Sequence, residues 1–191
     1  MMRNARRVSV QELDRFQLPA GFRGRSAVIV QLWWLTQATL FRLSPQFLYG
    51  WRSLLLRLFG ARVGRGVKIR PTATVTYPWK CEIGDFSWVG DDVVIYCLAD
   101  VKIGRNSVVS QRSYLCAGDH DPGSVSFDIR GRPIVIEDEA WVCADVFVAP
   151  GVTIARGAVI GARSSVFKDM PSDMICKGHP CVPIKCRTSV S

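Results

Sequence analysis

Histidine is scarce in this chain of 191 residues, which contains only His120 and His179. The seven cysteines form no CxxC pair and show no Cys/His spacing of the zinc type. Their odd number and their spacing argue against a disulfide framework and indicate reduced thiols in a cytosolic protein. With 48% hydrophobic residues, the chain can bury a sizeable core, and its length fits one domain with a modest appendage.

Acidic residues are nearly absent from the first 70 positions, where Glu12 and Asp14 stand against 13 Lys and Arg. That segment therefore has a formal charge of +11, and because the whole chain has +9, the remaining 121 residues sum to −2. The basic residues are interleaved with Trp and Leu rather than arranged in a DNA- or RNA-binding motif. Nucleic acid is therefore not an expected partner.

The sequence also lacks an apolar run long enough for a membrane-spanning helix, which needs about 20 residues. Residues 27–43 are interrupted by Gln and Thr, and residues 45–59 contain Arg52 and Arg57. A cleaved signal peptide is not expected either, because a long polar and charged stretch precedes the first apolar run and no small-residue cleavage site follows it.

Both apolar stretches instead predict helices. Ser26 and Ser44 can serve as N-caps, Pro45 suits a first helical position, and Gly60 suits the exit from the second helix. Two interpretations of these helices are compatible. They pack on the rest of the protein, or they form a basic amphipathic element that lies on an anionic membrane surface.

From position 63 onward, an aliphatic residue returns at every sixth position, with one interruption. Glycine often follows the aliphatic residue, and the residue four places after it is usually small or β-branched. A period of six fits neither an α-helix nor a simple alternating strand. It predicts an all-β fold, a parallel β-helix in which each hexapeptide forms one flat side of a triangular coil. This aliphatic ladder consists of Val63, Ile69, Val75, Ile83, Val89, Ile95, Ile103, Val109, Leu115, Ile136, Val142, Val148, Ile154, Ile160 and Val166.

Three hexapeptides make one coil, and the ladder groups into five coils that begin at positions 63, 83, 103, 136 and 154. The first coils are two residues longer than three hexapeptides, which predicts a two-residue bulge at one corner. The interval from Leu115 to Ile136 is much longer than one hexapeptide. About fifteen residues must therefore leave the coil as a loop, at about 119–135, and His120 lies at its root.

The chain resembles the left-handed β-helix acyltransferases over roughly residues 63–185, in its ladder, its single extruded loop and its closing segment "GVTIARGAVIGARSSVFKDMPSDMICKGHPCVPIK". That segment is similar to the "PGVTIG…VIGAGS.V.KD.P…..GNPA" ending of the sugar O-acetyltransferases. Three upstream stretches resemble the branch that acetylates sugars during colanic acid and related exopolysaccharide synthesis: "WRSLLLRLFGARVG", "PWKCEIGDFSWVGDDVVIY" and "VVSQRSYLCAGDHD".

The residues and the resemblance together divide the chain into three expected parts. Residues 1–62 form a basic, apolar helical segment, residues 63–170 form a left-handed parallel β-helix acyltransferase domain, and residues 171–191 form a closing segment. The resemblance also implies a homotrimer, with acetyl-CoA as the donor substrate in the groove between adjacent subunits and a sugar hydroxyl as the acceptor. No metal is expected.

By the same resemblance, His120 is the general base, which takes the proton of the attacking hydroxyl because imidazole titrates near the working pH. His179, in the closing "GHP" turn, is expected to be structural or peripheral. A base needs a partner that orients its ring, and the sequence does not choose among the candidate groups. The candidates are Asp119 and Asp121, which flank His120, and Asp91, Asp92 and Tyr96, which lie one coil earlier near the expected acceptor-binding positions.

Donor binding is expected on the later coils. The resemblance places Trp141 beside the active site, the backbone around Ala144 against the thioester, where an amide could stabilise the oxyanion, and coenzyme A past Ala162. Val182 stands where many relatives have a basic residue toward the 3′-phosphate. Phosphate contacts are therefore expected from Lys168, Lys177, Lys185 or Arg187.

Two other classes of protein share this fold. Zinc-dependent carbonic anhydrases need three imidazoles per site, which a chain with two histidines cannot supply. A non-catalytic scaffold or interaction protein at the membrane surface would keep the ladder but has no need of His120, Trp141 and the loop together. The sequence therefore favours a cytoplasmic O-acetyltransferase that acetylates an exopolysaccharide intermediate. We expect the acceptor sugar to be attached to a lipid at the inner membrane face.

Overall fold

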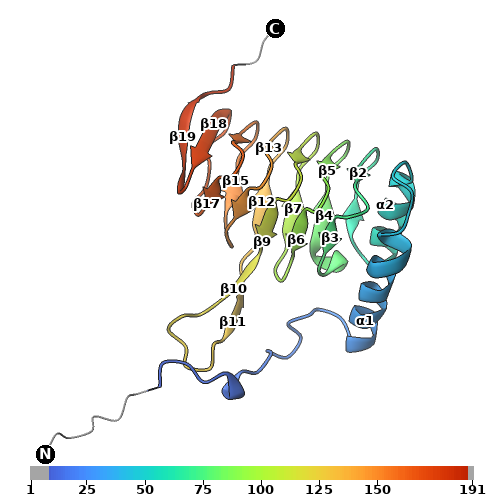
Figure 1. Cartoon of the computed structure of the whole chain (residues 1–191), viewed down its shortest axis with the longest axis vertical. Coiled ribbons are helices and arrows are strands. Elements are labelled where there is room, and N and C mark those ends of the chain that lie inside the picture. Colours follow the sequence, from blue (N-terminus) through green and yellow to red (C-terminus); the bar gives the residue numbers. More distant parts are fainter. Residues whose placement is uncertain (1–8, 189–191) are drawn as a thin grey trace, which may run out of the picture.

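The computed structural model describes residues 9–188, which form a parallel β-helix with a pair of helices at one end (Figure 1). Three parallel sheets make the sides of the prism, and we name them A, B and C in chain order. Sheet A consists of β1 (Arg62–Val63), β4 (Cys81–Ile83), β7 (Val101–Ile103), β12 (Ile134–Ile136) and β15 (Thr153–Ile154).

The other two sides have the same construction. Sheet B contains β2 (Lys68–Ile69), β5 (Trp88–Val89), β8 (Val108–Val109), β13 (Trp141–Val142) and β16 (Val159–Ile160), and is extended by β18 (Met174–Gly178) and the antiparallel β19 (Cys181–Cys186). Sheet C contains β3 (Thr74–Val75), β6 (Val94–Tyr96), β9 (Tyr114–Cys116), β14 (Phe147–Val148) and β17 (Ser165–Val166).

The strand register confirms the hexapeptide ladder. Val63 pairs with Ile83, Ile83 with Ile103, and Ile136 with both Ile103 and Ile154, as the predicted coil starts require. Every ladder residue is buried, and each stacks on its equivalents because the coils are in register. Burying a branched aliphatic side chain contributes about 1.5–3 kcal/mol, so the ladder residues form a stabilising central stack within the hydrophobic core.

Glycine follows the ladder residue where the next coil approaches closely. A Cβ on Gly84 would lie 2.5 Å from the backbone nitrogen of Arg105, and one on Gly90 would lie 2.6 Å from that of Gln111. No real Cβ has such a contact, so these corners accept only glycine unless the coils separate. The glycines noted in the repeat are thus required by coil stacking.

The corner between sheets C and A carries both irregularities expected from the coil lengths. In the first coil the extra residues form a short 3₁₀ turn, η3 (Pro78–Lys80). In the third coil the same corner extrudes an antiparallel hairpin, β10 (Gly118–His120) with β11 (Ile129–Gly131), which we call the arm. The arm points away from the prism and meets a short N-terminal 3₁₀ turn, η1 (Leu13–Arg15), through the hydrogen bond from the Glu12 amide to the Val125 carbonyl (Figure 1).

Two helices cover the open end of the first coil. They are α1 (Ala27–Thr36), continued by a π-helical turn η2 (Gln37–Phe41), and α2 (Tyr49–Leu58). Their inner side chains join the hydrophobic core: Val30, Trp33, Phe41, Leu55 and Leu56. The interpretation that the helices pack on the β-helix is therefore confirmed. Within residues 9–188, no helix has the length and apolar character needed to cross a membrane.

The helices also supply hydrogen-bond donors to the first coil. In the later coils each ladder carbonyl accepts an amide of the preceding coil, such as Ile83 O from Gly64 N at 2.8 Å. The first coil has no preceding coil, and side chains replace the missing amides. Arg57 Nε donates to Val63 O at 2.9 Å, Arg52 Nε to Ile69 O at 2.6 Å, and Trp33 Nε1 to Val75 O at 2.7 Å.

The predicted start of the second helix is wrong. The helix begins at Tyr49 rather than at Pro45, and Ser44 does not cap it. The physical reason is the buried guanidinium of Arg52, which forms hydrogen bonds with residues of this segment. It donates to Ser44 Oγ at 2.8 Å, Pro45 O at 2.9 Å and Gln46 O at 2.6 Å. Residues 44–48 therefore form a turn, whereas the predicted Ser26 cap and Gly60 exit are present.

Replacing Arg52 by Met is expected to lower the free energy of unfolding by about 3 kcal/mol, because the change leaves several carbonyls, one of them fully buried, without a donor. Urea unfolding followed by circular dichroism measures the loss. Arg57→Met is the matched control on the same helix. The Arg57 side chain is exposed, so water can replace it, and a loss below about 1 kcal/mol is expected. Equal losses for the two variants would contradict this account of the cap.

Candidate active site

His120 lies on the arm, and among residues 9–188 only one of its two ring nitrogens has a hydrogen-bond partner. Its Nδ1 is 2.7 Å from the carbonyl oxygen of Phe127. Because a carbonyl can only accept, Nδ1 carries the hydrogen in the neutral ring and Nε2 holds the free lone pair. The Phe127 ring stacks on the imidazole with 3.9 Å between the ring centroids and an interplanar angle of 11°. The Phe16 ring also packs against the imidazole, with 5.8 Å between the centroids.

The two acids that flank His120 hold the arm rather than the imidazole. Asp119 accepts from Arg130 at 3.0 Å and from Arg132 at 2.8 Å. Partial burial opposes its ionisation, but these hydrogen bonds outweigh it and lower the pKa of Asp119. Asp121 accepts the amide of Gly123 at 2.9 Å. Among residues 9–188, the group within hydrogen-bond distance of the His120 ring is the Phe127 carbonyl rather than one of the candidate side chains.

The candidates from the earlier coil lie elsewhere. Asp91 pairs with Arg70 at 2.8 Å, and this hydrogen bond lowers the pKa of Asp91. Asp92 is an exposed corner residue with a positive φ of 54°. Tyr96 is near the root of the arm, where its carbonyl accepts the Ala117 amide at 3.0 Å. Its ring packs on Tyr114 on the outer face of sheet C.

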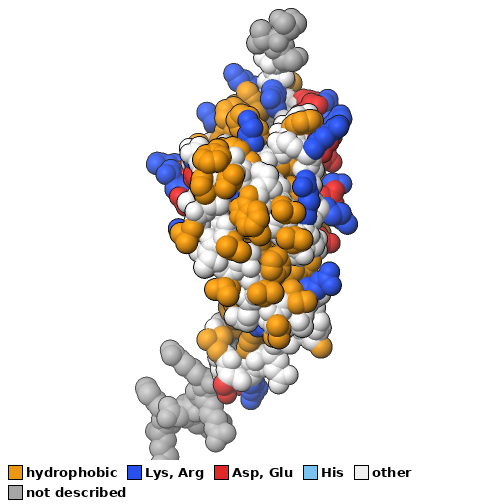
Figure 2. Space-filling model, turned by 90° about the vertical axis from the view of Figure 1, so that its right-hand side faces the viewer, with side chains coloured by type: hydrophobic (Ala, Val, Ile, Leu, Met, Phe, Trp, Pro, Cys, Tyr) orange, Lys and Arg blue, Asp and Glu red, His pale blue; other side chains and the backbone are white. Residues whose placement is uncertain are grey.

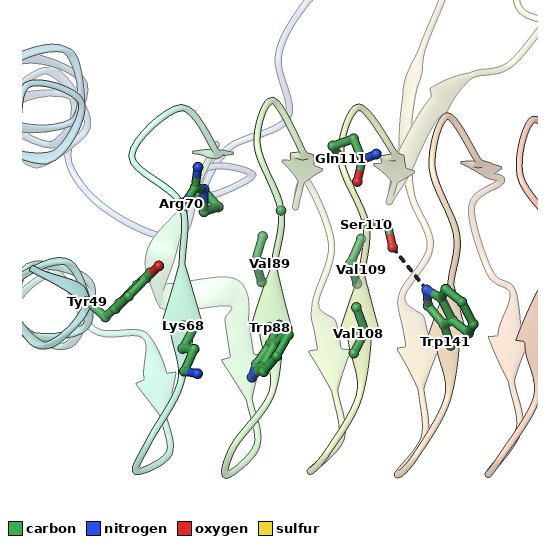
Figure 3. A pocket seen from close by; sticks show the side chains of 11 residues that line it. Tyr49, Lys68, Arg70, Trp88, Val89, Val108, Val109, Ser110, Gln111 and Trp141 are labelled. Atoms are coloured by element: carbon green, nitrogen blue, oxygen red, sulfur yellow. Dashed lines mark hydrogen bonds between the residues drawn. The ribbon is translucent and has the colours of Figure 1, made fainter. Parts of the chain in front are cut away.

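Trp141 lies on the outer face of sheet B, in a groove that sequence reasoning did not find. Its indole Nε1 donates to Ser110 Oγ at 3.0 Å, and the side chain is 45% exposed (Figure 3). The groove has a volume of about 580 Å³ and runs from Tyr49 on α2 to Trp141. Between these ends it is lined by Lys68, Arg70, Trp88, Val89, Gly90, Val108, Val109, Ser110 and Gln111.

The groove has both stacking surfaces and charge. The Lys68 ammonium lies 4.5 Å from the centre of the Trp88 ring, which is half exposed. A signal for these residues was present in the sequence. Lys68, Trp88 and Trp141 each directly precede a ladder residue of sheet B, and alternation along a strand places them on the outer face.

In a single chain, His120 and Trp141 lie on different sides of the molecule. The arm leaves the prism at the edge between sheets C and A, whereas Trp141 belongs to sheet B. The two residues that the sequence places at one active site are therefore not brought together by one subunit.

The three outer faces differ in chemistry. Sheet A presents charged side chains, with Arg62 and Lys102 paired to Glu82 at 2.7 and 3.7 Å. Sheet C presents a continuous aromatic row in which Tyr114 packs on Tyr96 at 5.9 Å and on Phe147 at 6.1 Å. Sheet B presents the groove. Sheets B and C therefore both present aromatic side chains on their outer faces, whereas sheet A presents ion pairs.

The predicted donor-site residues are divided between corners. Ala144 and Ala162 occupy the same corner of successive coils, since Val142 pairs with Ile160. Lys177, on β18, lies beside Gly161 at that corner. Lys168 lies at the corner between sheets C and A, away from them. Lys185 is on β19, opposite Ile175 of β18. Each of the three lysines is exposed.

The cysteines do not offer an activated nucleophile near the groove. Cys143, two residues beyond Trp141, is half-buried, and burial raises its pKa. Burial also raises the pKa of Cys116 at the base of the arm. A thiol attacks only as its thiolate, so these groups are poor candidates for a covalent step. Residues 9–188 contain no cluster of His, Cys, Asp and Glu suited to holding a metal ion.

His179 lies on the closing turn rather than on the arm. Its Nδ1 lies 2.6 Å from Ser165 Oγ, and its ring packs edge-on against Phe167. The side chain is exposed at the closing turn after β18.

Comparison with known proteins shows which family the chain is similar to. No family model matches it. It is 56% identical to the putative colanic acid biosynthesis acetyltransferase WcaF of Escherichia coli K12 over 176 residues, which cover 92% of this chain and 97% of that protein. A galactoside acetyltransferase in complex with coenzyme A superposes with a TM-score of 0.77 at 24% identity, covering 90% of this chain and 85% of the other.

A hexapeptide-repeat acetyltransferase of Vibrio cholerae in complex with acetyl coenzyme A also has a TM-score of 0.77, at 22% identity, covering 87% of this chain and 92% of the other. These two likenesses identify the fold. Because of the extent of its identity to WcaF, the chain belongs to the hexapeptide-repeat, left-handed β-helix acetyltransferases, in the family of the colanic acid biosynthesis acetyltransferases.

Proposed function

We propose that this acetyltransferase moves the acetyl group of acetyl-CoA to a sugar hydroxyl of an exopolysaccharide intermediate, with His120 as general base. The observation that carries the proposal is the bond from Nδ1 to the Phe127 carbonyl, because it leaves the Nε2 lone pair free to accept a proton. The relationship to WcaF and the donor complexes of the structural neighbours support the substrates.

In this mechanism His120 Nε2 takes the proton of the acceptor hydroxyl as that oxygen attacks the thioester carbonyl. The new carbon–oxygen bond gives a tetrahedral oxyanion, for which the backbone amide near Ala144 is the proposed donor. When the carbon–sulfur bond breaks, the imidazolium returns the proton to the leaving thiolate. The Phe127 carbonyl keeps its bond to Nδ1–H throughout, and the stacked ring limits rotation of the imidazole.

We propose that the active unit is a homotrimer in which the aromatic face of sheet C lies opposite sheet B of the next subunit, with the groove as the open cleft between them. A three-fold arrangement uses two different faces of each subunit and leaves one for solvent. This matches the exposed aromatic side chains of sheets B and C and the ion-paired surface of sheet A. The arm leaves the edge of sheet C, so this packing carries His120 to the Trp141 groove of the neighbour. The mapped donor site likewise needs walls from two subunits.

The groove suits a saccharide acceptor. Exposed Trp88 and Trp141 provide flat apolar surfaces on which the faces of sugar rings can pack, and Ser110 and Gln111 offer hydrogen-bonding groups between them. Asp92 and Tyr96 remain proposed acceptor contacts from the adjoining corner and face. We propose that the sugar is carried on a lipid and acetylated at the cytoplasmic side of the inner membrane, where the enzyme contacts anionic lipid.

His120→Gln is expected to lower kcat by about 10²–10⁴-fold, the usual contribution of a general base. Binding of acetyl-CoA, measured by calorimetry, and the trimer, measured by sedimentation, are expected to be unchanged, because the imidazole only moves a proton. His179→Gln is the matched control and is expected to retain most of the activity. An H120Q enzyme with more than about half the wild-type rate at saturating substrates would refute the assignment.

The shared site predicts complementation between two inactive chains. His120→Ala and Trp141→Ala are each expected to lose at least about tenfold in kcat/KM as homotrimers. In trimers mixed at equal ratio, about a quarter of the interfaces combine an intact arm with an intact groove, so about a quarter of wild-type activity should return. Activity equal to the mean of the two parents would place both residues in one subunit's site and overturn the proposed packing.

A further inference from the structure

The outward-facing sides of α1 and α2 are apolar, and so are the inward-facing side chains that pack in the hydrophobic core. Val28, Leu32 and Leu35 follow one another at spacings of four and three along α1, and Trp51, Leu54 and Leu58 do so along α2. This spacing places each set on one helix face. We call these six residues, with Leu43 and Phe47 between the helices, the cap surface.

The cap surface is exposed to an unusual degree for large apolar side chains. Leu43 is 78% exposed, Phe47 77% and Leu58 71%. Figure 2, which views the end of the molecule that bears the helices, shows hydrophobic side chains gathered across this end with Lys and Arg at its margins. Contiguous apolar surface of this kind on a soluble domain indicates a site of contact with a protein or a membrane.

The positive charge around the cap surface favours a membrane over a protein partner. The chain has no Asp or Glu between Asp14 and Glu82, and Arg25, Arg42 and Arg57 are exposed on or beside the cap helices. A second copy of the chain meeting this face through its own cap surface would bring the same positive charges together. An anionic bilayer satisfies both features, because head groups attract the arginines while the leucines and Trp51 enter the boundary of the acyl chains.

We propose that the cap surface is a docking site for an anionic lipid bilayer. It sets the orientation of the enzyme, because Tyr49 of α2 forms one end of the groove on sheet B (Figure 3). With the cap surface on the membrane, the groove begins at the lipid head groups and rises along the prism toward Trp141. If the proposed function is right, this orientation also assigns the Tyr49 end of the groove to the lipid-proximal part of a lipid-linked saccharide.

Flotation of the full-length protein with vesicles tests the docking site. Wild-type protein is expected to float with phosphatidylglycerol vesicles at low salt, and much less at high salt or with phosphatidylcholine alone. The double variant Leu35→Gln, Leu58→Gln should bind at least about tenfold more weakly, because it removes two apolar side chains from the interface. The matched control is Leu13→Gln, Ile184→Gln, which changes two exposed apolar residues elsewhere and should bind like wild type.

Acetylation assays separate this inference from the proposed function. L35Q/L58Q is expected to acetylate a soluble short saccharide at the wild-type rate and to lose at least about tenfold on a lipid-linked acceptor in vesicles. If wild-type protein does not float, or both double variants float equally, the docking site is wrong even though soluble sugars are acetylated. If sedimentation reveals assemblies larger than a trimer that L35Q/L58Q disperses, the surface binds copies of the chain and the inference is overturned. Vesicle binding without acetylation of any sugar would instead contradict the proposed function.

Discussion

The first coil of the β-helix exposes three ladder carbonyls that no preceding coil can satisfy, and the rest of the structure depends on how they are capped. Arg57, Arg52 and Trp33 each donate to one of them, one per side of the triangle. An unpaired buried carbonyl costs about 1–3 kcal/mol, so the buried hydrogen bonds of Arg52 and Trp33 are needed, whereas water can replace the exposed Arg57. The cap is therefore a helical pair with long donor side chains on its inner face and an apolar cover over the aliphatic ladder.

Once the ladder is stacked, the outward positions of the coils are free to carry function. Burial fixes every sixth residue, whereas the residue just before it points to the surface and tolerates any side chain. The three faces accordingly differ: sheet A is charged, sheet B has the groove and sheet C is aromatic. In one chain the arm and Trp141 lie on different sides of the molecule, so His120 and the groove on sheet B are separate features of the single chain.

The imidazole ring of His120 is held by the backbone of its own arm. The arm turns back so that the Phe127 carbonyl reaches Nδ1, and the same residue, with a positive φ of 55°, stacks its ring on the imidazole. A carbonyl fixes the tautomer as a carboxylate would, without adding a negative charge. Asp119 and Asp121 are then free to hold the arm itself, Asp119 through Arg130 and Arg132.

The sequence by itself determined the β-helix, the five coil starts and the position of His120 at the extruded loop, because each depends on a local period that encodes burial. It did not determine the start of α2, since the turn at Ser44 follows from the buried Arg52 eight residues later. The partner of His120 and the groove from Tyr49 to Trp141 were likewise decided only by tertiary structure. They join residues whose spacing follows no repeat, and only the folded coil brings those residues within reach of one another.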